Sequence, residues 1–163
     1  MGVLRSPNIE FCLNDPHVGR YFSAGPLRFG GMNFPVIVTA GDSHTEAVSG
    51  ALQTVPAHLD TGATSTAIDI NLARHMGLDP VGVATVRTAG GIMEFPKFIV
   101  NLQFPDSTLS ARRNMLICSA NLGFDTAKSL TDLNNFGILI GRDVMASWNI
   151  VWNGPTSTVI IND

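Results

Sequence analysis

The chain has little charge for its size. Charged residues make up only 14% of its 163 residues, while hydrophobic residues make up 45%. This composition excludes an intrinsically disordered chain, because disorder goes with strong charge and few apolar residues. The formal net charge is -3, and the missing basic surplus argues against a nucleic-acid-binding protein. The length suits one domain and leaves no room for two large lobes in one chain.

Cysteine and long apolar runs are also scarce. The two cysteines, Cys12 and Cys118, form no CxxC pair, so a disulfide framework or a zinc ribbon is excluded and two reduced, packed thiols are expected. No H-E-x-x-H motif or paired Cys/His spacing is present, and we therefore expect no metal and no cofactor. The first ten residues hold no apolar signal core, and apolar runs such as 138–140 are short. We expect a cytoplasmic protein with no membrane partner.

Glycine and proline, by contrast, are plentiful. The chain has 16 Gly and nine Pro, which predicts many turns and favours strands over long helices. Residues 1–33 read as an irregular N-terminal arm with one short strand near 9–13, followed by a domain at 34–163. A helix is expected from Ile68 to Met76, closed by Gly77. Strands are expected at 34–39, 51–59, 81–87, 93–104, 114–119 and 137–141, and as a closing hairpin around Asn153-Gly154 at 149–152 and 156–161.

The most specific chemical signal follows the expected strand 51–59. It reads Asp60-Thr61-Gly62-Ala63. Glycine allows a tight turn whose N–H groups can bond to the carboxylate, the threonine adds a hydroxyl, and the alanine leaves space beside the loop. On its own this tripeptide could be a simple turn.

Two later features follow it in a specific order. A hairpin turn, Thr88-Ala89-Gly90-Gly91, comes after the helix, and the run Ile138-Leu139-Ile140-Gly141-Arg142-Asp143 comes near the end. The order of the three motifs resembles that of the retropepsin-like aspartic proteases, over about residues 34–161. The resemblance implies a mostly-β, closed, barrel-like domain with one short helix and a flap hairpin.

The resemblance also implies a role for each motif residue. Asp60 would be the catalytic aspartate, supported by Thr61, Gly62 and Ala63 in its loop. The flap tip, which would close over a peptide substrate, would be Ala89, Gly90 and Gly91. The residues that would pack around the catalytic loop are Ile138, Leu139, Ile140 and Gly141.

The sequence departs from the family pattern at two positions. His58 stands where an apolar residue is usual; since alternation along a strand puts 58 and 59 on opposite faces, we expect little effect of His58 on the aspartate. Thr64 stands where retroviral members carry an acid that pairs with an arginine such as Arg142. This difference puts a retroviral type of assembly in doubt.

Aspartic-protease chemistry needs two carboxylates, and the chain supplies one. The residues after Asp42, Asp106 and Asp125 do not complete a second Asp-Thr/Ser-Gly. A C2 homodimer would bring the same aspartate to the site twice. The sequence therefore predicts an aspartic endopeptidase whose partners are a second copy of itself and a peptide or protein substrate.

Other interpretations remain. Gly41-Asp42-Ser43 resembles the start of some serine esterases, but these need a late histidine, and all four histidines precede residue 76. A non-catalytic dimeric module that binds peptides or serves as a scaffold could share the fold. Trp148 and Trp152 are expected to be anchors of the core or of a dimer interface.

Overall fold

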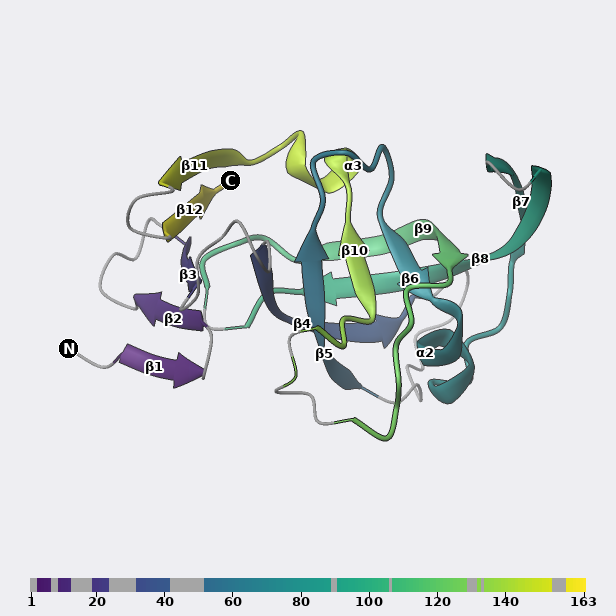
Figure 1. The fold of residues 1–163 in the computed structure, drawn as a ribbon, viewed down its shortest axis with the longest axis horizontal. Helices are drawn as coiled ribbons and strands as arrows, with labels where there is room; N and C mark the ends of the chain where they lie inside the picture. Colours follow the sequence, from purple (N-terminus) through teal and green to yellow (C-terminus); the bar gives the residue numbers. More distant parts are fainter. Residues whose placement is uncertain are drawn as a thin grey trace.

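The computed structural model describes residues 3–6, 9–12, 19–23, 32–41, 52–88, 91–105, 107–128, 132, 134–153 and 158–163. These residues form two β-sheets and two short helices (Figure 1). The mostly-β expectation is thus confirmed. No helix in these ranges is both long and apolar enough to cross a membrane.

The larger sheet has seven strands in the order β4-β5-β10-β6-β9-β8-β7. Its strands are β4 (Met32–Ala40), β5 (Gln53–Leu59), β6 (Ala67–Asp69), β7 (Gly82–Thr88), β8 (Gly91–Gln103), β9 (Arg112–Ala120) and β10 (Ile138–Ile140). An additional antiparallel pairing joins β4 to β8. Because β4 pairs with both β5 and β8, the sheet from β4 round to β8 closes on itself, and β7 continues from β8 outside this ring.

The hydrophobic core lies inside this ring. Alternate residues of β4 and β5 point into it, among them Phe34, Val36, Val55 and Ala57, all with no exposed surface. This is the period-2 pattern expected of a strand with one buried face. Trp148 is 8% exposed and meets Phe104 edge to face at 5.2 Å. It is therefore a core anchor, whereas Trp152 is 49% exposed.

The N-terminal segment holds more regular structure than the irregular arm with one short strand near 9–13 that the sequence suggested. It contributes β1 (Val3–Ser6), β2 (Ile9–Cys12) and β3 (Gly19–Ser23) to a five-stranded sheet. β3 pairs with β12 (Thr158–Asn162), which in turn pairs with β11 (Asn149–Asn153). The partner of β3 comes from the other end of the chain, and a local reading of turn residues carries no signal for such a pairing.

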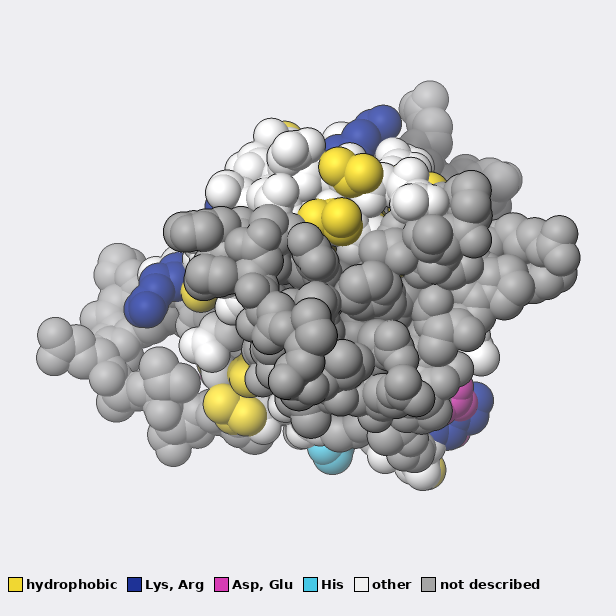
Figure 2. Space-filling model, turned by 90° about the vertical axis from the view of Figure 1, so that its left-hand side faces the viewer, with side chains coloured by type: hydrophobic (Ala, Val, Ile, Leu, Met, Phe, Trp, Pro, Cys, Tyr) yellow, Lys and Arg dark blue, Asp and Glu magenta, His cyan; other side chains and the backbone are white. Residues whose placement is uncertain are grey.

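On the face in Figure 2, the described hydrophobic side chains appear as small separate groups.

The helix after β6 is shorter than expected. Ile68 and Asp69 belong to β6, and α2 spans Ile70–His75. Asp69 is its N-cap, because the carboxylate accepts from the backbone N–H groups of Asn71 and Leu72. Gly77 follows the helix with φ 66°, the left-handed conformation expected at this end. The second helix, α3 (Arg142–Met145), follows Gly141, which is its N-cap.

The closing hairpin has a longer loop than Asn153-Gly154 alone would make. Asn153 pairs with Thr158, so the connection covers residues 154–157, which lie outside the described residues. A two-residue turn at 153–154 would place Pro155 at the start of the next strand. Proline has no N–H to donate there, which favours the longer connection.

Candidate active site

Asp60 lies where β5 ends, next to the strand β10. The two strands run parallel, with Leu59 opposite Ile140. The Asp60 N–H donates to the Ile140 carbonyl at 3.0 Å, which extends the pairing by one residue. The Asp60 side chain is only partly buried. In Figure 1 the chain leaves β5 at the top, beside α3, and returns into β6. The strands thus carry Asp60 out of the core to a position that water can reach.

The residues after Asp60 form the expected tight turn. The Gly62 N–H donates to Asp60 Oδ1 at 2.8 Å, and the Ala63 N–H donates to the Asp60 carbonyl at 3.2 Å. A Cβ on residue 62 would lie 3.0 Å from that same Oδ1, so glycine permits the close approach. Thr61 is exposed at the tip of the turn. One carboxylate oxygen is thereby oriented by a backbone donor.

A polar cluster ties this turn to the segment after β10. Thr66, only 1% exposed, donates its hydroxyl to Asp143 Oδ1 at 2.7 Å and accepts from the Gly141 N–H at 3.0 Å. Asp143 also accepts from the Thr66 N–H at 2.9 Å. Thr66 and Asp143 were not among the candidate site residues. The sequence offered one signal for each residue: Thr66 is a hydroxyl residue shortly after the Asp-Thr-Gly, and Asp143 is an acid shortly after Gly141.

Arg142 and Thr64 are in contact although no acid stands at residue 64. The Arg142 guanidinium donates from Nη2 to Thr64 Oγ1 at 3.0 Å, and its backbone N–H donates to the Ala63 carbonyl at 3.0 Å. The hydroxyl of Thr64 therefore occupies the place of the carboxylate that the family pattern suggested. The two segments stay joined without an ion pair at this position.

His58 lies closer to the chemistry than the sequence suggested. Alternation does separate 58 from 59, but it puts 58 and 60 on the same face of β5. Burial lowers the pKa of His58 below its usual value of 6.5, and the charge of Asp60, a smaller effect, acts to raise it. The comparison of residues 58 and 59 thus leaves out residue 60, which is the aspartate itself.

The flap-like hairpin is formed by β7 and β8. Thr88 pairs with Gly91, so the expected hairpin forms and its strands extend further toward the turn than the sequence predicted. Gly91 has φ 117°, which a residue with a side chain would rarely adopt. Ala89 and Gly90, the other predicted tip residues, lie outside the described residues. Near the tip, Ile92 is 68% exposed and Met93 48% exposed.

The predicted residues thus fall into two parts of the sheet. Asp60, Gly62 and Ala63 are hydrogen-bonded to each other or to the segment 138–142. In that segment Ile138 and Ile140 have no exposed surface, and Leu139 is partly buried. Gly91 lies on the β7–β8 hairpin at the end of the strand order. The structure joins the Asp60 turn directly to the segment 138–142, the third motif in chain order.

Glycine is required at residue 141 by close packing. A Cβ there would come within 2.4 Å of the Ser65 carbonyl carbon and 2.7 Å of the Thr66 nitrogen. Backbone atoms cannot move aside as a flexible side chain can. This contact explains physically why the hydrophobic run at 138–140 ends in glycine, beside the turn that carries Asp60.

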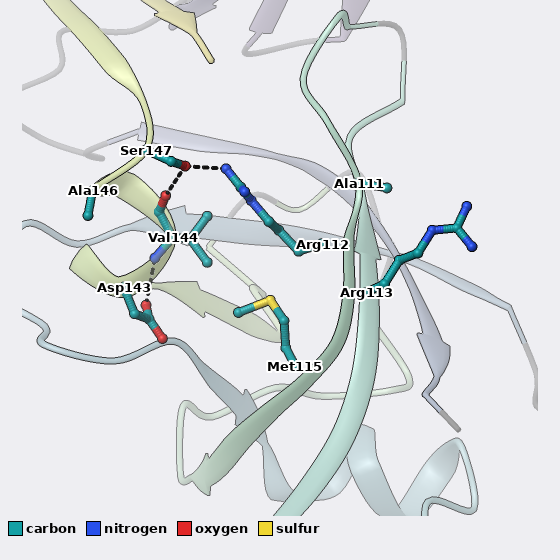
Figure 3. A pocket seen from close by; sticks show the side chains of 8 residues that line it. All are labelled: Ala111, Arg112, Arg113, Met115, Asp143, Val144, Ala146 and Ser147. Carbon is teal, nitrogen blue, oxygen red and sulfur yellow. Dashed lines mark hydrogen bonds between the residues drawn. The ribbon is translucent and has the colours of Figure 1, made fainter. Parts of the chain in front are cut away.

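An open hollow of about 500 Å³ lies between α3 and the start of β9 (Figure 3). Arg112 points across it toward Ser147 and donates a hydrogen bond to that hydroxyl, while Arg113 points away from the helix. None of the residues 60–63 lines this hollow. Among the described residues, no group of three or more His, Cys, Asp or Glu side chains could hold a metal ion.

Comparison with known proteins finds a family model that is similar to the middle of the chain. A family model described as aspartyl protease matches residues 44–109, a segment that includes Asp60 and the β7–β8 hairpin. This match confirms the resemblance to aspartic proteases. No curated protein matches the chain. Among the matching solved structures is a retropepsin-like aspartic protease from Rickettsia conorii, with 14% identity, a TM-score of 0.43, and coverage of 80% of this chain and 93% of that one.

Proposed function

We propose that this chain, whose residues 44–109 match the aspartyl protease family, is an aspartic endopeptidase that acts as a homodimer with Asp60 as its catalytic residue. One observation carries the proposal. The carboxylate of Asp60 is partly exposed, and the Gly62 N–H holds one of its oxygens at 2.8 Å. A carboxylate fixed by a backbone donor and open to water is suited to acid–base work on a bound substrate.

The dimer follows from the number of carboxylates. Hydrolysis by this chemistry uses two carboxylates that share one proton around a water molecule. The sequence holds a single Asp-Thr-Gly, at residue 60. Two-fold symmetry provides the second Asp60 from the partner and puts the site on the symmetry axis. The tight turn would place Thr61 beside the equivalent turn of the partner.

The reaction then balances with these two groups alone. The ionised Asp60 takes a proton from the water as its oxygen attacks the peptide carbonyl carbon. The protonated Asp60 of the other chain gives its proton to the carbonyl oxygen. When the C–N bond breaks, the first Asp60 gives the proton taken from water to the amine nitrogen, and a hydroxyl of the tetrahedral intermediate returns its proton to the second Asp60 as the new carboxyl group forms. No metal or cofactor takes part in these steps.

The β7–β8 hairpin is the part of the chain suited to cover a peptide. Val83, Val86, Ile92 and Met93 are all exposed on it, and Gly91 gives its tip a backbone that few other residues adopt. Closing an apolar cover over the substrate would exclude water from the carboxylates and strengthen their interactions with the reacting groups. Ala89, Gly90 and Gly91 would form the edge that meets the substrate.

The test is cleavage of a diverse peptide mixture between pH 3 and 7, roughly the range in which a shared carboxylate proton acts. We expect internal cleavage by the purified chain, inhibition by pepstatin, and no cleavage by Asp60→Asn. Equal cleavage by Asp60→Asn would refute the proposal. Binding of peptides without any cleavage over this range would favour a non-catalytic peptide-binding module instead.

A further inference from the structure

His58 lies on the face of β5 that also carries Asp60, and this face is not the hydrophobic core. Val55, Ala57 and Leu59, the odd-numbered residues, are buried in the core. His58 and Asp60, the even-numbered residues at the end of the strand, are only partly buried. Since side chains of a strand alternate, the imidazole projects toward the same side as the carboxylate two residues on.

Two contacts fix the orientation of the imidazole. Asn33, 7% exposed, stands directly opposite His58 in the β4–β5 ladder, and its Oδ1 lies 2.5 Å from His58 Nδ1. An amide oxygen only accepts, so Nδ1 carries the hydrogen in this contact. On the other side, the ring stacks on Phe136 with centroids 5.0 Å apart and planes at 27°. The ring is held, and its second nitrogen, Nε2, is left to gain or lose the proton.

The charges around this ring are few. From β4 it faces Asn33, from β10 it has Leu139 as its ladder partner, and from the segment before β10 it meets Phe136. None of these three side chains titrates. Among the described residues, Asp60 is the charged group that acts on His58. The pair is therefore a simple one, an imidazole and a carboxylate on one face of one strand.

We propose that His58 is a positioning residue for the Asp60 pair, whose imidazolium stabilises the ionised carboxylate and extends activity to lower pH. The inference rests on the proposed function and goes beyond it, because the chemistry of the two carboxylates alone does not require a histidine. In the dimer each Asp60 would have its own His58, so the effect would act on both members of the pair.

The coupling must be reciprocal. The carboxylate of Asp60 raises the pKa of His58, which means that it favours the imidazolium. By linkage the imidazolium favours the carboxylate by the same free energy. Burial acts in the opposite direction and lowers the pKa of His58 overall. The imidazole is therefore neutral near pH 7 and gains its charge on the acid side.

The first experiment compares the pH dependence of kcat/KM in the wild type and in His58→Asn. The asparagine amide can still donate to Asn33 Oδ1 but carries no charge. We expect the midpoint of the acid limb to move upward by about half a pH unit, the size expected of one partly screened charge. His75→Asn, at an exposed position of α2, is the matched control and should leave the midpoint in place. An unmoved acid limb in an active His58→Asn would overturn the proposal.

The second experiment needs no peptidase activity. The His58 ring is titrated by NMR in the wild type and in Asp60→Asn. Since the carboxylate raises the pKa of His58, its removal should lower that pKa. An unchanged His58 titration would overturn the proposal even if the protein cleaves peptides. A shifted titration in a protein that cleaves nothing would support the coupling and count against the proposed function alone.

Discussion

Thr66 and Asp143, which lie 77 residues apart in the chain, are joined by a hydrogen bond of 2.7 Å from the threonine hydroxyl to Oδ1 of the carboxylate. The same hydroxyl accepts from the Gly141 N–H, and Thr66 itself is buried. The turn that carries Asp60 is thus fastened at its far end to the segment that follows β10. A carboxylate that must meet a second copy of itself benefits from such a rigid support.

Removing the Thr66 hydroxyl should loosen this support. Thr66→Val keeps the shape of the side chain but leaves the Gly141 N–H and one Asp143 oxygen without that partner. We expect a loss of about 1–3 kcal/mol in the free energy of unfolding, measured by urea denaturation at a fixed protein concentration. Thr66→Ser retains the hydroxyl and is the control. The interpretation is wrong if the valine variant is as stable as the serine variant.

Gly141 should not tolerate a methyl group. A Cβ at this position would meet the Ser65 carbonyl carbon at 2.4 Å, so the backbone of the Asp60 turn would have to shift. Gly141→Ala should lower the free energy of unfolding by about 1–3 kcal/mol and reduce peptidase activity. Gly82→Ala, where no atom lies within 4 Å of the added Cβ, should change stability by less than about 0.5 kcal/mol. Equal stability of the two variants would contradict the packing argument.

Asp69 should be the most sensitive structural carboxylate. It has no exposed surface, and its two oxygens accept from the N–H groups of Asn71, Leu72, Leu122 and Phe124. Asp69→Asn keeps the shape but turns one acceptor into a donor that faces N–H groups. We expect a destabilisation of about 3 kcal/mol, read from thermal or urea unfolding. The exposed Asp79→Asn serves as control, and a similar small effect at both sites would disprove the role of Asp69.

Asp60→Asn should remove activity without removing the fold. The amide neither takes up nor gives up a proton as a carboxylate does, so kcat should fall by at least about 10²–10⁴-fold. Circular dichroism and the unfolding transition should stay close to those of the wild type, because the amide oxygen of the variant can still accept from the Gly62 N–H. Asp79→Asn should keep full activity. An inactive variant that is also unfolded would not support a catalytic role, and a folded, fully active one would exclude it.

The sequence predicts those parts of the fold that depend on neighbouring residues. The turn at Asp60, the β7–β8 hairpin and the left-handed Gly77 all follow from local conformational preferences. Features that depend on distant partners are missed. Of the three strands before residue 24, the sequence predicts the one near 9–13; β3 pairs with β12 from the other end of the chain. The helix begins late because Asp69 pairs in β6 and then caps α2.

The candidate active site shows the same division between features set by neighbouring residues and features set by distant partners. Asp60 and Gly141 were identified from their motifs, but Thr66 and Asp143 become partners only through the fold. His58 could have been found from the sequence alone, since residues two apart on a strand share a face. Its stacking on Phe136 and its contact with Asn33 could not, because these bring together three separate segments.

The central claim, that two copies of Asp60 form one site, is tested most directly by mixing wild type with Asp60→Asn. The two proteins are unfolded together, refolded at constant total concentration, and assayed for peptide cleavage. If each site needs an Asp60 from both chains, mixed dimers are inactive and activity follows the square of the wild-type fraction, about one quarter of full activity in an equal mixture. A linear decrease, with about one half remaining in the equal mixture, would mean that each chain works alone and would contradict the account.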